Sequence, residues 1–143
     1  MKKSLFRITS LLALAFAAAT QMAQAQQPVR VTIPFAFTAG EKALPAGEYQ
    51  VEKAAQGSLA LMIRRIDGSE GMFVTTSATA SSEPQTKSKL IFHRYGNQYF
   101  LSQVWVAGYA QGSQLRESTK EKEQTLLARN ATRQEVTIVA RLH

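Results

Sequence analysis

The 143-residue sequence contains no cysteine, only two histidines and a single aspartate. Without cysteine, the chain has no disulfide, no thiolate nucleophile and no thiolate metal ligand, and a lipid anchor attached to cysteine is also excluded. Histidine is the commonest general base, and the two that are present are His93 and the terminal His143. The aspartate, Asp67, precedes a glycine in a turn, where a carboxylate usually binds its own backbone. These scarcities leave few routes to catalysis.

The first 25 residues have the three parts of a secretory signal peptide. A basic start carries Lys2, Lys3 and Arg7, an apolar run covers residues 11–19, and small residues mark a cleavage site at Ala23-Gln24-Ala25. The apolar run is too short to cross a bilayer comfortably, which favours a signal peptide over a membrane anchor. We therefore predict export to the periplasm or the exterior, with no membrane span.

Cleavage after Ala25 would leave residues 26–143 as a single domain. The signal segment holds three of the 17 basic residues and none of the ten acidic ones, so its removal lowers the net charge from +7 to +4. An excess of this size aids solubility but gives only weak attraction to a phosphate backbone. The sequence therefore predicts no nucleic-acid partner.

The stretch from Lys89 to Gly108 predicts a central β-hairpin. Two runs of β-branched and aromatic residues flank Gly96-Asn97, and glycine in the first central position suits a type II′ turn. Both faces of the hairpin are apolar, which places it in the middle of a sheet with cover on each side. The predicted faces are Leu90, Phe92, Leu101 and Trp105 on one side, and Ile91, Phe100, Val104 and Val106 on the other.

Alternating apolar residues predict further strands on both sides of this hairpin. The clearest is 29–37, where Pro34 requires a sheet edge or a bulge because proline cannot donate to a ladder. Segments 38–47, 78–88 and 108–113 are predicted as turns or loops. The strands are predicted at 29–37, 49–52, 59–66, 72–77, 89–95, 98–105 and 135–142. The expected fold is all-β, a small antiparallel barrel or sandwich of about seven strands with one late surface helix.

The late helix is predicted over 115–129. Ser118 and Glu121 match a capping box, in which each side chain bonds the other residue's backbone N–H, and Asn130 suits the C-cap. Glu117, Glu121 and Glu123 alternate with lysines, a pattern typical of a solvated face. No metal site is predicted there or elsewhere, because no ligand pair with a histidine has suitable spacing.

The central run KLIFHRYGNQYFLSQVW resembles a segment of an uncharacterised family of exported bacterial proteins with a small β-domain. The stretch from Pro34 to Val51 is similar to their N-terminal half, and Leu115 to Ala128 resembles their charged helix. The resemblance covers most of the mature chain. It implies a small β-fold and an envelope or extracellular location, and it implies no activity, substrate or catalytic residue.

Three functions remain open from the sequence. The first is non-enzymatic binding of a small apolar ligand or an envelope partner, with Phe92, Arg94, Tyr99, Leu101 and Trp105 as the predicted ligand-binding residues, because a small barrel can enclose one apolar molecule. The second is a homo-oligomeric structural protein that assembles through the edge strand. The third is a hydrolase that uses His93. No catalytic residue and no cofactor is assigned, since no orienting acid or nucleophile accompanies His93 in the sequence pattern.

Overall fold

The computed structural model describes residues 28–127 and 132–141, which form ten strands and one helix. The predicted signal peptide over 1–25 and the predicted C-cap at Asn130 lie outside these residues. In chain order the elements are β1 (Val29–Ile33), β2 (Phe37–Ala39), β3 (Lys42–Leu44), β4 (Gly47–Lys53), β5 (Ala60–Arg65), β6 (Gly71–Ala80), β7 (Lys89–Tyr95), β8 (Gln98–Trp105), β9 (Gln111–Leu115), α2 (Thr119–Leu127) and β10 (Gln134–Val139).

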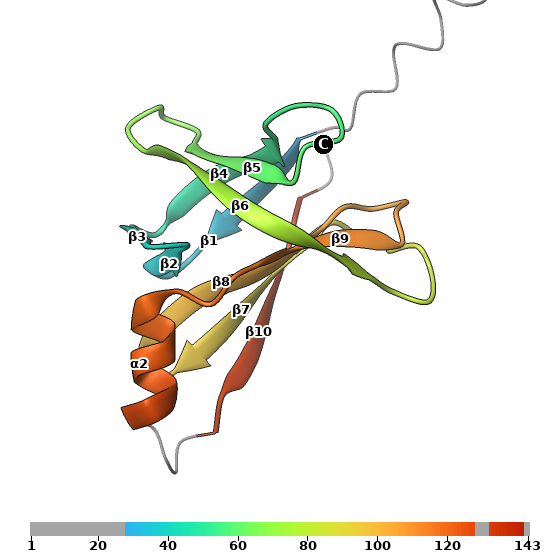
Figure 1. Cartoon of the computed structure of the whole chain (residues 1–143). Helices are drawn as coiled ribbons and strands as arrows, with labels where there is room; N and C mark the ends of the chain where they lie inside the picture. Colours follow the sequence, from blue (N-terminus) through green and yellow to red (C-terminus); the bar gives the residue numbers. More distant parts are fainter. Residues whose placement is uncertain (1–27, 128–131, 142–143) are drawn as a thin grey trace, which may run out of the picture.

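The strands form one open, mixed sheet (Figure 1). Their order is β1-β4-β5-β6-β9-β8-β2-β3, and β7 pairs with β8 while β10 pairs with β7. The ladders are antiparallel except for β2 and β8, which run parallel where Thr38 lies opposite Phe100. Among the described residues β1 pairs only with β4 and β10 only with β7, so the last strand does not close the sheet. The mostly-β fold with one late helix is confirmed, but the closed barrel and the count of seven strands are wrong.

The three strands that the pattern missed are short. Pro34 follows the last residue of β1, which confirms an edge strand there, and it divides the predicted strand 29–37 into β1 and β2. The supposed turn 38–47 contains β3, which pairs with β2 around Gly40 at a positive φ of 58°. Gln111–Leu115, part of which was predicted as a hairpin end, is β9. Such strands are held by their neighbours' backbone groups, so their side chains need not alternate.

Strand β6 joins the two halves of the sheet. Its residues 71–75 pair with β5, and its residues 76–80 pair with β9. At the change of partner Thr76 is buried, and its backbone N–H donates to the Leu59 carbonyl over 3.0 Å. Figure 1 shows β6 crossing from the β4–β5 side of the molecule to the β9 side. The sheet therefore folds over, with β1, β4 and β5 in one half and β7, β8 and β10 in the other.

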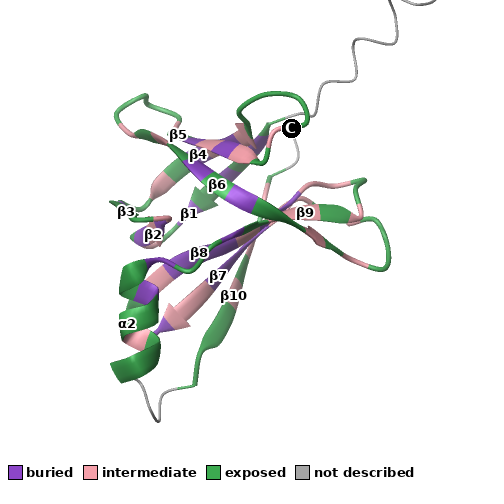
Figure 2. Ribbon diagram, viewed as in Figure 1, coloured by how far each residue is buried: buried purple, intermediate pink, exposed green. Residues whose placement is uncertain are grey.

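The hydrophobic core lies between these halves, and Figure 2 shows buried segments on β4, β5 and β6 as well as on β7 and β8. Aromatic residues connect the two sides. The ring of Phe37 on β2 meets Tyr49 edge-on at 5.3 Å between centroids and Phe92 at 5.5 Å. Tyr49 and Phe92 are both fully buried. Such edge-to-face contacts add to the stabilisation that burial itself provides.

The central hairpin has the predicted turn, but the pairing of its two strands differs from the prediction at the end away from the turn. Gly96 has a φ of 60° and the φ of Asn97 is not positive, as a type II′ turn requires. Strand β7 lies between β8 and β10, which confirms the mid-sheet position. A bulge at Ile91/Phe92 then pairs Leu90 with Val104. The bulge exchanges the two predicted faces beyond Ser102, because one extra residue reverses side-chain direction. Trp105 therefore lies away from the Leu90 face.

Tyr49 is predicted to make the folded protein less stable at high pH. Its hydroxyl donates to the Pro45 carbonyl over 2.6 Å, and burial raises its pKa above the ordinary value of 10.0, with Arg65 opposing the rise. As pH rises, the Tyr49 hydroxyl therefore loses its proton in the unfolded chain before it does so in the folded protein. The contribution of this hydroxyl to the free energy of unfolding is complete below pH 10, and it is lost as the pH rises from the unfolded to the folded pKa.

We expect urea unfolding from pH 7 to pH 11 to show this loss. Tyr49→Phe should cost about 1 kcal/mol at pH 7, the worth of one hydrogen bond. Above pH 10 the gap between the two proteins should shrink, because phenylalanine has no proton to lose. Parallel pH profiles for the two proteins would contradict the assignment.

Candidate functional site

A pocket of about 280 Å³ opens between the two halves of the sheet. Its floor is apolar and comes from both sides: Val51 and Leu61 from β4 and β5, and Val104 from β8. These three side chains are almost completely buried and belong to the hydrophobic core. At this pocket, the edge of the hydrophobic core is therefore accessible to a small molecule.

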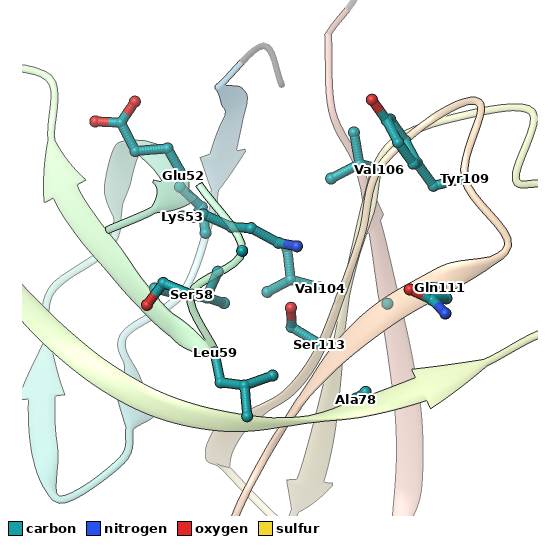
Figure 3. A pocket seen from close by; sticks show the side chains of 14 residues that line it. Glu52, Lys53, Ser58, Leu59, Ala78, Val104, Val106, Tyr109, Gln111 and Ser113 are labelled. Carbon is teal, nitrogen blue, oxygen red and sulfur yellow. The ribbon is translucent and has the colours of Figure 1, made fainter. Parts of the chain in front are cut away.

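The rim of the pocket is more polar and more exposed. Leu59 and Tyr109 lie at it with 55% and 43% of their surface exposed. In Figure 3 the Lys53 amine extends across the opening toward Val104, whereas the Glu52 carboxylate points away. An apolar floor with a few polar groups at the mouth is the usual composition of a small-molecule site.

Two turns shape the mouth. On one side, the backbone of Ala54 bonds Ala60, and Gly57 has a φ of 74° in the connecting turn. On the other side, Gly108 has a φ of 87° in the turn that leads to Tyr109. Both glycines adopt left-handed backbone that other residues rarely take. The two connections thus place Gly57 and Tyr109 at the mouth of the pocket.

Gly112 lets β9 approach Trp105 closely. The two residues are paired across β8 and β9, and a Cβ at position 112 would lie 2.7 Å from two atoms of the indole ring. The indole N–H donates to Gln103 over 2.9 Å. Gly112 lines the pocket, whereas Trp105, which is held against it, does not.

Four of the five predicted ligand residues lie together on the hairpin, where Phe92 pairs with Leu101 and Arg94 with Tyr99, whereas Trp105 lies on the other face. Phe92 and Leu101 are core residues, and Trp105 lies against Gly112. The Arg94 guanidinium lies 5.5 Å from the Tyr99 ring centroid, and Tyr99 stacks on Phe35 at 3.8 Å. None of the five lines the pocket between the halves.

Tyr99 does line a second, shallower depression. This groove of about 440 Å³ lies between β2–β3, the tip of the hairpin and α2, and it is widely open to solvent. Lys120 and Glu123 on α2 contribute opposite charges to its wall. A wide groove with mixed charge provides little enclosure for a small molecule.

A buried polar cluster joins α2 to the hairpin. Glu121 is 3% exposed, and its carboxylate lies 2.6 Å from His93 Nδ1 and accepts a 3.2 Å bond from the Tyr95 hydroxyl. The Ser118 hydroxyl accepts from the Glu121 N–H at 3.1 Å, which confirms that half of the capping box. The other half is wrong, since the Glu121 side chain contacts the sheet. Its placement on a solvated face is also wrong.

This cluster explains how a polar helix is held on the sheet. Leu126 and Leu127 are 75% and 79% exposed, and Glu121 is the buried residue of α2. The helix thus docks through a carboxylate at its first turn, a position that the helix dipole also favours. Figure 1 shows α2 against the β7–β8 end.

Among the described residues the His93 side chain bonds Glu121, and no serine, threonine or cysteine nucleophile there bonds its ring. An acid–histidine pair needs a nucleophile or an activated water to act on a substrate. Asp67 is occupied in its own turn, where bonds from the Ser69 hydroxyl and N–H hold its pKa below the ordinary range. The arrangement supports a structural role for His93.

The part of the chain that the structure describes contains no group of three potential metal ligands. No helix in it has the length and apolar character that crossing a bilayer requires. Comparison of the chain with family models, with curated proteins and with solved structures finds no match.

The pocket residues carry no signal that sequence analysis could have used. They come from four separate segments, 51–61, 78, 104–106 and 109–113, and most of them are ordinary strand or turn residues. The pairing of His93 with Glu121 was equally hidden, because 28 positions separate them. A glutamate at the third helical position predicts a capping box just as well as a tertiary contact.

Proposed function

We propose that this protein binds a small, mainly apolar molecule in the pocket between the two halves of the sheet, without changing it chemically. The observation that carries the proposal is the opening of the core at Val51, Leu61 and Val104. Apolar side chains at the base of an open pocket favour an apolar occupant, because it releases water from them. Binding takes place outside the cytoplasm, a proposal that rests on the predicted signal peptide.

The pocket volume limits the size of the occupant. The volume of about 280 Å³ lies just below the usual range for ligand pockets, which starts near 300 Å³, so the occupant must be small. Octan-1-ol, with an eight-carbon chain, is therefore a suitable probe.

We expect octan-1-ol to bind saturably and to shift the amide resonances of the pocket-lining residues in heteronuclear NMR spectra. Val106→Trp should weaken this binding by about tenfold or more, because the indole would fill the space that the probe needs. Val106 lines the pocket and is half-buried, so the larger ring has room to point into the opening.

Val139→Trp is the matched control, since Val139 is 49% exposed on β10 and does not line the pocket. Circular dichroism checks that both variants fold. If octan-1-ol shifts no pocket resonance, or if the two variants bind it equally well, the pocket is not the binding site.

A further inference from the structure

We infer that the occupant of the pocket carries a negative charge at one end, as in a small amphipathic carboxylate, and that Lys53 is its counter-ion. The inference rests on the proposed function and adds the chemical class of the ligand. Two observations support it: the position of the Lys53 amine, which forms no ion pair with the described residues, and the polarity of the pocket walls.

Lys53 is the last residue of β4 and the only basic residue among those that line the pocket. Its amine extends over the opening, toward Val104, in Figure 3. None of the ion pairs formed by the described residues includes Lys53. A lysine in this position offers three N–H donors to an acceptor at the mouth.

The other polar groups at the mouth are consistent with an anionic end. Glu52 is the one acidic lining residue, and its carboxylate points away from the pocket in Figure 3. The Ser113 hydroxyl lies on the opposite wall, has no side-chain hydrogen bond to the described residues, and can donate to an acceptor at the mouth. A carboxylate at the mouth would thus meet a cation and a hydroxyl, while its chain lies on Val51, Leu61 and Val104.

Octanoate and octan-1-ol separate the charge from the chain, because both have eight carbons and differ in the head group. We expect octanoate to bind the full-length protein more tightly than octan-1-ol. Lys53→Met keeps the length of the side chain and removes the charge, and it should weaken octanoate binding by about three- to tenfold, as expected for a partly exposed charge-assisted bond. Its effect on octan-1-ol should be less than about twofold.

Salt provides an independent measurement. Raising the ionic strength from about 0.02 M to about 0.5 M should weaken octanoate binding and leave octan-1-ol binding unchanged, because screening acts on the charge alone. Lys53→Met should abolish this salt dependence. Lys87→Met is the control, since Lys87 is exposed in the 81–88 loop and does not line the pocket.

The outcomes distinguish this inference from the proposal beneath it. If neither probe binds, the proposed function fails. If octan-1-ol binds as tightly as octanoate, or if Lys53→Met and Lys87→Met affect octanoate equally, the apolar pocket stands and the anionic ligand class is wrong. Tighter octanoate binding that depends on Lys53 and on salt supports both.

Discussion

Replacing His93 by alanine is expected to destabilise the protein by about 1–3 kcal/mol, the usual cost of leaving a buried polar group without a hydrogen-bond partner. The Glu121 carboxylate would keep only the Tyr95 hydroxyl as a partner, at 3.2 Å, in a site where it is 3% exposed. A buried charge without adequate partners costs more than the interaction itself was worth. Urea unfolding followed by circular dichroism measures the loss.

A double-mutant cycle with Glu121→Gln isolates the pair. Glutamine keeps the shape and the acceptor oxygen, so Glu121→Gln alone should cost about 1 kcal/mol, the worth of an ordinary hydrogen bond. The double variant should be more stable than His93→Ala alone, because it contains no unpaired charge. Additive effects of the two substitutions would show that the residues do not interact.

Hydrogen exchange shows where the destabilisation appears. Because α2 is attached mainly through Glu121, His93→Ala should accelerate exchange of the α2 amides before those of β4 and β5. A catalytic role for His93 predicts a different outcome, namely a stable variant that has lost an activity. The exchange pattern therefore separates the two roles.

Replacing Phe92 by alanine is expected to cost about 3–5 kcal/mol, the range for deleting a large aromatic side chain from a core. Phe92 is fully buried, and the rings of Phe35 and Phe37 meet it edge-on at 5.1 Å and 5.5 Å. Both neighbours come from the segment after β1, so the cavity would lie where that segment packs on β7. They cannot both move in to fill it, since Phe35 is also stacked on Tyr99.

Phe73→Ala is the matched control for this substitution. Phe73 lies on β6 with 68% of its surface exposed, and its removal should change the free energy of unfolding by no more than about 0.5 kcal/mol. Thermal and urea unfolding of the two variants make the comparison. A similar loss for both would mean that Phe92 does not hold the core, and a loss below 1 kcal/mol for Phe92→Ala would have the same meaning.

The central hairpin shows how far local pattern determines a structure. Gly96 fixed the turn, and the turn fixed four residue pairs, from Tyr95–Gln98 to Phe92–Leu101. The register beyond them depended on a bulge at Ile91/Phe92, which no residue in the sequence marks. Since one extra residue reverses the faces, Val104 joined the main hydrophobic cluster, and Trp105 lies buried on the opposite face.

The charged helix shows the same division. Ser118 is the predicted N-cap, and its hydroxyl accepts the Glu121 N–H, so the helix begins at Thr119 and not at Leu115, which belongs to β9. Which of the three glutamates is buried depends on how the helix lies on β7. Only the folded structure brings His93 to Glu121, so the sequence pattern of alternating charges pointed to solvent.

The sequence by itself determined that the chain is mostly β, that Pro34 marks an edge, and that a hairpin turns at Gly96, because alternation, proline geometry and positive φ act over a few neighbouring residues. The tertiary structure alone decided that the sheet stays open, that β6 exchanges partners at Thr76, and that Val51, Leu61 and Val104 share one pocket. These depend on packing between segments that are distant along the chain, where the free energy comes from burial and shape and no short-range pattern records it.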